Sequence, residues 1–136
     1  MSQELIRKAF ETRLKAWADA QTPAIPVAWP NVAFVPPAGR YVRAHTLPAQ
    51  TQFLSLDGEC KTWEGIFQVT FCMPLGTGSG TVESLITSLG AAFAQSFTQD
   101  GLRIFLLRPF GAAPAIPDGE RYVVPVSATY HCDTAP

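Results

Sequence analysis

The stretch Thr62–Phe97 changes its hydrophobic period once, and this change constrains the fold more than any other feature. Within Trp63–Met73, large apolar residues mostly alternate with polar ones, which is typical of a half-buried strand. Pro74 ends the strand, because proline has no N–H for a neighbouring strand. Over Val82–Phe97, apolar residues recur at spacings of three and four, which predicts one face of a helix. The two apolar faces therefore predict a helix packed on a sheet.

A second amphipathic helix is predicted at the N-terminus, ending near Ala20. Ser2 is a candidate N-cap, and Glu4 suits the first turn of a helix. Charged residues of both signs cover its polar side, so we interpret that side as solvated rather than membrane-binding. The apolar residues at helical spacing are Leu5, Ile6, Ala9, Phe10, Leu14 and Trp17.

Alternation and turn signals predict the remaining elements. Asp57-Gly58 favours a hairpin whose second arm is the strand Trp63–Met73. Pro125 indicates an edge position or a bulge. We expect strands at Val27–Trp29, Tyr41–Leu47, within Gln50–Lys61, at Leu102–Arg108 and at Tyr122–Cys132, with loops at Asn31–Arg40 and Phe110–Gly119.

The order helix, four strands, helix, two strands predicts one α+β domain over residues 1–136. Its sheet is mixed, mainly antiparallel and packed by two helices. The length of 136 residues suffices for one sizeable core. Charged residues make up only 15% of the chain, so either an assembly hides part of the surface or the surface is polar but uncharged. A net charge of −1 argues against a nucleic-acid binder, and no apolar run is long enough to span a membrane.

The chain carries no clear catalytic or ligand-binding pattern. Gly76–Thr81 lies between a strand and a helix, but it lacks the lysine and the spacing of a phosphate-binding loop. Ser127 and His131 share one strand face, yet four residues of strand, about 13 Å, separate them. We therefore expect no enzyme, no nucleotide and no other cofactor. A zinc site is not expected either, because no known ligand spacing matches Cys60, Cys132, His45 and His131.

The cysteine count predicts reduced thiols. Cys60, Cys72 and Cys132 are odd in number, and the first ten residues contain no apolar signal region. We expect a cytosolic chain in which all three thiols are free. Titration of the denatured, unreduced protein with a thiol reagent should therefore count three thiols, and a smaller count would contradict this prediction.

Several local runs carry a family resemblance. They are Ala28-Trp29-Pro30-Asn31, the Gly39–Arg43 run, and Glu64–Val69 followed by Pro74, a glycine-rich turn and a helix. Together with the N-terminal helix they resemble the small tail terminator-like proteins of tailed bacteriophages and prophages, the group related to the tail terminator of phage lambda. The likeness covers nearly the whole chain, as an order of elements plus these runs.

The resemblance implies a structural protein with an α+β fold that forms a ring, expected to be a hexamer. The ring would close the finished tail tube and offer a surface for head–tail joining. The implied partners are further copies of the chain, the major tail tube protein and the head–tail connector protein. The implied location is the virion tail, after assembly in the bacterial cytoplasm. Two alternatives stay open: another neck or tail-completion protein, and a small enzyme with a pocket over its sheet.

Contacts in such a ring would use exposed sheet edges and loops. Aromatic side chains suit the centres of these contacts, because they dominate interface hot spots. Packing in the core of the domain is the alternative for each aromatic residue. The candidate interface residues are Trp29, Phe34, Arg40, Tyr41, Arg43 and Phe110.

Overall fold

A computed structural model describes residues 3–21, 24–30, 32–37, 39–48, 52–53, 61–74, 79–93, 96–99, 102–114, 116–118 and 121–134. The elements within these ranges follow the order helix, four strands, helix, four strands. They are α1 (Gln3–Asp19), β1 (Val27–Ala28), β2 (Tyr41–Pro48), β3 (Gln52–Phe53), β4 (Lys61–Pro74), α2 (Ser79–Ala92), β5 (Ser96–Gln99), β6 (Leu102–Ala112), β7 (Ile116–Asp118) and β8 (Arg121–Thr134).

The strands form one sheet in the order β1-β2-β4-β8-β6-β5, with β3 beside β4 and β7 beside β8. The two central strands, β4 and β8, pair from Lys61↔Thr134 to Pro74↔Arg121 without a break. The pairing of β1 with β2 is parallel, and the other described pairings are antiparallel. The predicted class, an α+β fold with a mainly antiparallel sheet and two helices, is confirmed.

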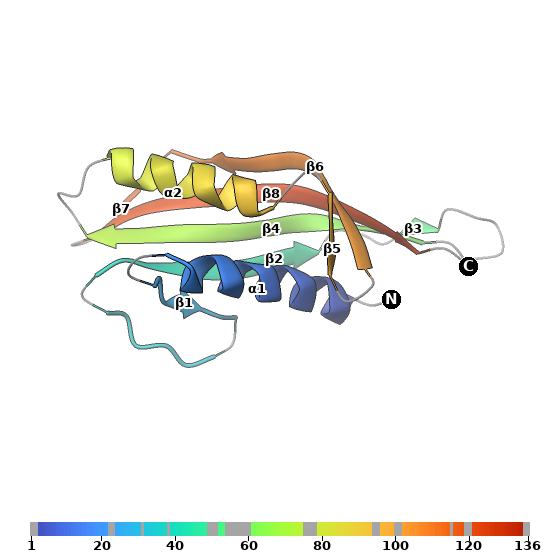
Figure 1. The fold of residues 1–136 in the computed structure, drawn as a ribbon, viewed down its shortest axis with the longest axis horizontal. Coiled ribbons are helices and arrows are strands. Elements are labelled where there is room, and N and C mark those ends of the chain that lie inside the picture. Colours follow the sequence, from blue (N-terminus) through green and yellow to red (C-terminus); the bar gives the residue numbers. More distant parts are fainter. Residues whose placement is uncertain are drawn as a thin grey trace.

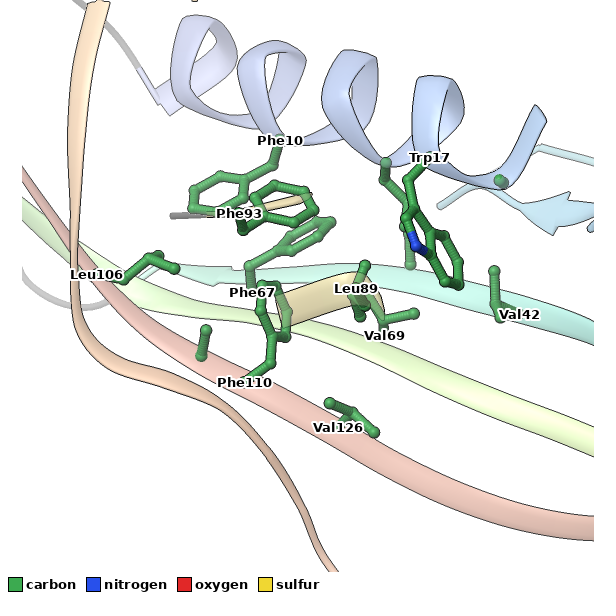
Figure 2. Close-up of a cluster of buried hydrophobic side chains, with 14 of the residues drawn as sticks. Phe10, Trp17, Val42, Phe67, Val69, Leu89, Phe93, Leu106, Phe110 and Val126 are labelled. Carbon is green, nitrogen blue, oxygen red and sulfur yellow. The ribbon is translucent and has the colours of Figure 1, made fainter. Parts of the chain in front are cut away.

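Both helices cover the same face of the sheet (Figure 1). Alternation puts Phe67, Val69 and Phe71 of β4 on this face, where all three are fully buried. From α1, the ring of Phe10 lies 4.5 Å from the ring of Phe67, centroid to centroid. Phe93, directly after α2, packs 5.9 Å from Phe10 (Figure 2). The core therefore lies between the helices and this one face.

The second helix ends earlier than the expected boundary near Phe97. The guanidinium of Arg13 donates to the carbonyl oxygen of Ala92 at 3.0 Å, and this bond satisfies one of the last carbonyls of α2. Phe97 instead lies in β5, opposite Ile104 of β6. The expected boundary is wrong, because pairing with β6 overrides the local helical spacing while Phe97 still reaches the core.

The expected loop Phe110–Gly119 is also wrong in part. Strand β6 continues to Ala112, and the short strand β7 pairs with the start of β8. The register of β6 against β8 shifts between Leu106 and Arg108 and again between Arg108 and Gly111. Each shift inserts one extra residue into β6, which moves the following side chains to the other face of the sheet. The second shift reverses the effect of the first, so Phe110 faces the core.

Pro125 lies in the middle of the sheet, opposite Thr70 of β4, so the edge position is wrong. Its carbonyl oxygen accepts a hydrogen bond from the N–H of Ala113 at 2.8 Å. Because the N–H and C=O of a strand residue point to the same side, the missing N–H of proline faces β6 and costs no bond to β4. The irregular pairing that Pro125 signals is found in β6 instead.

The predicted hairpin before β4 is confirmed by the pairs Gln52↔Thr62 and Phe53↔Lys61. Its turn at Asp57-Gly58 lies outside the described residues, as do the candidate cap Ser2 and the segment Gly76–Gly78 of the glycine-rich connector.

Gly65 gives a testable consequence of this packing. A Cβ atom there would lie 2.6 Å from the hydroxyl oxygen of Tyr130 and 2.7 Å from the carbonyl oxygen of Leu47. We expect Gly65→Ala to lower the free energy of unfolding by about 1–3 kcal/mol through overpacking. Gly90→Ala in α2 is the matched control, since its Cβ meets no atom within 4 Å.

The control should raise the free energy of unfolding by about 0.5–1 kcal/mol, because alanine favours a helix interior. Urea unfolding of both variants checks the pair. Equal effects in the two variants would contradict the close approach of Tyr130 to β4.

Candidate assembly interface

Three of the six predicted interface residues contact one another at the start of β2. The rings of Phe34 and Tyr41 are 5.2 Å apart, centroid to centroid. The guanidinium of Arg43 lies 5.7 Å from the ring centre of Tyr41 and donates to its hydroxyl at 3.2 Å. The Phe34 side chain is half-buried and Arg43 is exposed, whereas Tyr41 is buried beneath them. This arrangement leaves a mixed aromatic and basic surface beside the loop that precedes β2.

The other three predicted residues lie elsewhere. Trp29 is partly buried and packs against the helix–sheet core, and Arg40 is half-buried just before β2. Phe110 is 9% exposed and packs against Phe93, with 5.1 Å between the ring centroids. Core packing, the alternative considered for each aromatic residue, therefore describes Phe110 and in part Trp29, whereas Tyr41 is buried outside the helix–sheet core. A role of the six residues in an interface stays a prediction.

Arg121 is the residue that the sequence reasoning missed. Arg121 is the first residue of β8, and its guanidinium lies 4.7 Å from the ring centre of Tyr41. It donates one hydrogen bond to the carbonyl oxygen of Gly39 at 3.0 Å and another to that of Pro37. Two carbonyls of the proline-rich loop are thus satisfied from a distant strand. The sequence shows that such a loop needs donors, but not which arginine supplies them.

At the start of β2, the loop before it and Arg121 cover the face of the sheet opposite the helices, because Tyr41 and Cys72 are buried there. Farther along β2, this face carries exposed apolar side chains. Leu47 pairs with Ile66, and Ile66 pairs with Thr129 in the next strand. Leu47 is 49% exposed, Ile66 is 38% exposed and Leu107 of β6 is 56% exposed. The exposed arginines Arg43, Arg103 and Arg108 lie around these apolar residues. We call this surface, with its apolar and basic side chains, the open face.

The outer edge of β2 is only partly paired. Strand β1 pairs with Val42 and Arg43, and no described strand pairs with Ala44–Pro48 on that side. The N–H of Val42 donates to the carbonyl oxygen of Pro26 at 3.0 Å, so the backbone groups of Thr46 also point outward. Such an edge can accept a strand from another chain, although Pro48 limits it because proline lacks an N–H.

A hollow of about 410 Å³ adjoins this edge and is lined by Glu4, Arg7, Thr46 and Pro48. The hydroxyl oxygen of Thr46 is buried there, with no hydrogen-bond partner among the described residues. A hydrogen bond from Lys8, together with its positive charge, lowers the pKa of the exposed Glu4 carboxyl. Among its described lining residues, Glu4 supplies a carboxylate and Thr46 a hydroxyl, with no histidine or cysteine beside them.

The other groups considered for chemistry do not converge. Cys132 faces the core, whereas His131 lies on the opposite side of β8, where its ring stacks on Phe105. His45 is exposed on β2, two strands away, and Cys60 lies outside the described residues. No cluster of three His, Cys, Asp or Glu residues suited to a metal ion occurs within the described ranges. No described helix is long and apolar enough to cross a membrane.

One family model matches nearly the whole chain. The family model described as phage tail terminator protein matches residues 5–130. A solved structure identified by a sequence number alone shares 40% of its sequence with this chain. The match covers 100% of this chain and 99% of the other, with a TM-score of 0.83. A search of curated proteins found no significant match.

The contacts of Arg121 generate a prediction about the loop before β2. In Arg121→Ala, the carbonyls of Pro37 and Gly39 lose their donor and the Tyr41 ring loses its cation. We expect the free energy of unfolding to fall by about 1–2 kcal/mol. This loss is smaller than that expected for two buried hydrogen bonds from a charged group, because the site is partly exposed. Within residues 32–37, the amide of Val32 donates to the carbonyl oxygen of Trp29 at 3.3 Å. Its hydrogen–deuterium exchange should become at least about tenfold faster, which corresponds to a loss of about 1.4 kcal/mol.

Arg108→Ala on the open face is the matched control, because this arginine is exposed and far from the loop. It should leave exchange of the Val32 amide unchanged. Equal exchange in both variants would show that Arg121 does not hold the loop.

Proposed function

This chain belongs to the phage tail terminator protein family, a family of structural proteins of the virion tail, and we propose that it caps the tail tube when the tube reaches full length. A tube grows by adding identical subunits to an open end, and that contact does not close along the tube axis. Growth stops when a different protein binds the open end and presents a surface to which no further tube subunit binds. In this proposal the cap is a ring, expected to be a hexamer, that also provides the surface for head–tail joining.

The observation that supports capping most directly is the open face. The buried side of the sheet is mostly covered by α1 and α2. The opposite side exposes Leu47, Ile66 and Leu107 among arginines. Apolar residues with a polar rim are the usual composition of a protein interface, whereas an enzyme would require converging polar groups in a cleft.

A ring between two assemblies needs several unlike surfaces on each subunit. Contacts between neighbouring copies must be heterologous, with one surface meeting a different surface of the next copy. The partly paired edge of β2 and the loop before it lie at one side of the sheet, and β6 lies toward the other (Figure 1). This leaves the open face for the major tail tube protein or the connector protein. The proposal includes assembly in the bacterial cytoplasm, without membrane or specific nucleic-acid binding.

Deletion of the gene from an inducible phage or prophage tests the proposal. The expected result is overlong or headless tails, with normal particles restored by the intact gene. Tail lengths measured by electron microscopy decide the outcome. Normal-length tails joined to heads would contradict capping, and normal-length tails without heads would assign the chain to another neck or completion step.

A point variant then tests the open face. Ile66→Asp places a charge in its apolar centre and should abolish complementation, because the charge would be desolvated in the contact. Thr12→Asp on the exposed side of α1 is the matched control and should complement normally. Circular dichroism and thermal unfolding establish that both variants fold. A folded Ile66→Asp that complements normally would contradict the role of the open face.

A further inference from the structure

A second, smaller hollow lies between α2 and the sheet. Its volume is about 130 Å³, and its lining includes Val82, Glu83, Ile86, Ala112, Ala113 and Tyr122. The lining is mainly apolar, with the carboxylate of Glu83 as its charged group. An apolar cavity of ~150 Å³ holds a benzene molecule, so this hollow has room for one aliphatic side chain.

The loop before β2 carries the most exposed apolar side chains in the described ranges. Val35 is 90% exposed and Val32 is 60% exposed, and residues 32–37 contain no charge. The loop is held by the hydrogen bonds of Arg121 and by the tilted contact between the rings of Phe34 and Tyr41. A held loop loses little conformational entropy on binding, so an apolar side chain presented in this way is suited to a contact.

The loop and the hollow lie at the same end of the central strands but on opposite sides of the sheet. Tyr41 pairs with Cys72, and Tyr122 pairs with Met73, the next residue of β4. In Figure 1, the loop lies beyond β2, whereas the start of α2 lies toward β6. Strands β2, β4 and β8 separate the two features, so the loop does not fill the hollow of its own chain. The arrangement is that of a head-to-tail contact between copies.

We propose that Val35 of one copy inserts into the small hollow of the next copy and so joins neighbours in the ring. The proposal rests on the proposed function and names the contact between its subunits. The charges agree with this direction, because Arg40 follows the loop and Glu83 lines the hollow. Burial of a single valine side chain contributes too little to hold two free copies together. The ring therefore forms on the tube end, where further contacts add to this one.

Disulfide trapping in assembled tails tests the contact. Two differently tagged chains, Val35→Cys and Ala113→Cys, both in a Cys60→Ser background, are expressed in cells producing a phage that keeps its wild-type gene. The wild-type copies maintain capping. Purified tails are oxidised with copper phenanthroline and analysed on non-reducing gels. A disulfide requires Cβ atoms about 3.5–4.5 Å apart, so the heterodimer reports the inserted loop.

The matched control pairs Val35→Cys with Thr12→Cys instead of Ala113→Cys, because Thr12 is exposed on α1. The expected result is a heterodimer of the first pair at least tenfold above the control. Two results with both variants present in tails would overturn the proposed insertion of Val35 and leave the proposed capping intact. In one, the two pairs cross-link equally, and in the other, Val35→Cys cross-links only to a tube protein. If neither tagged chains nor wild-type chains occur in tails, the proposed function itself is overturned.

Discussion

The ring of Phe10 fixes which face of the sheet is left open. It stacks on Phe67 at 4.5 Å, lies 5.1 Å from Tyr130 and meets Phe93 at 5.9 Å, all between ring centroids. One side chain of α1 thereby contacts both central strands and the end of α2 (Figure 2). Truncation of a buried phenylalanine costs about 3–5 kcal/mol, a large part of the 5–15 kcal/mol that stabilises a typical domain. Two hydrogen bonds, Arg13 to Ala92 and Trp17 to Ser88, hold the helices together on that face.

The consequence is a molecule whose helix-covered face is mostly used for folding, whereas Leu47, Ile66 and Leu107 stay exposed on the opposite face. The ion pairs on α1 join residues four apart in the same helix, so they serve the helix rather than a partner. Arginines on the open face are instead mixed with exposed aliphatic residues. The loop before β2 adds a third surface, held by Arg121 from the far end of the chain's last strand. Family membership and these surfaces point to the same structural role in the tail.

Periodicity predicts the parts of this fold that depend on local contacts. Alternation in β4 and β8 and the helical spacing in α1 identify most of their buried residues, but Leu5 of α1, placed on the apolar face by its spacing, is 41% exposed. Periodicity fails where pairing between distant strands decides, as at Phe97, which leaves the helix to pair with β6. The same limit applies to the candidate site. The contact of Tyr41 with Arg43 is local, whereas Arg121 is 80 residues away along the chain and reaches Tyr41 only through the pairing of β4 with β8.

Footprinting of the chain in the free protein and in purified tails tests directly whether assembly uses the open face and leaves the outer side of α1 exposed. Hydroxyl radicals label Leu47, Ile66 and Leu107, and acetylation labels Lys8 and Lys15 on α1. Labelling of the three aliphatic residues should fall strongly in tails, while acetylation of the two lysines should stay unchanged. Protection of the lysines with unchanged labelling of the aliphatic residues would contradict assembly through the open face.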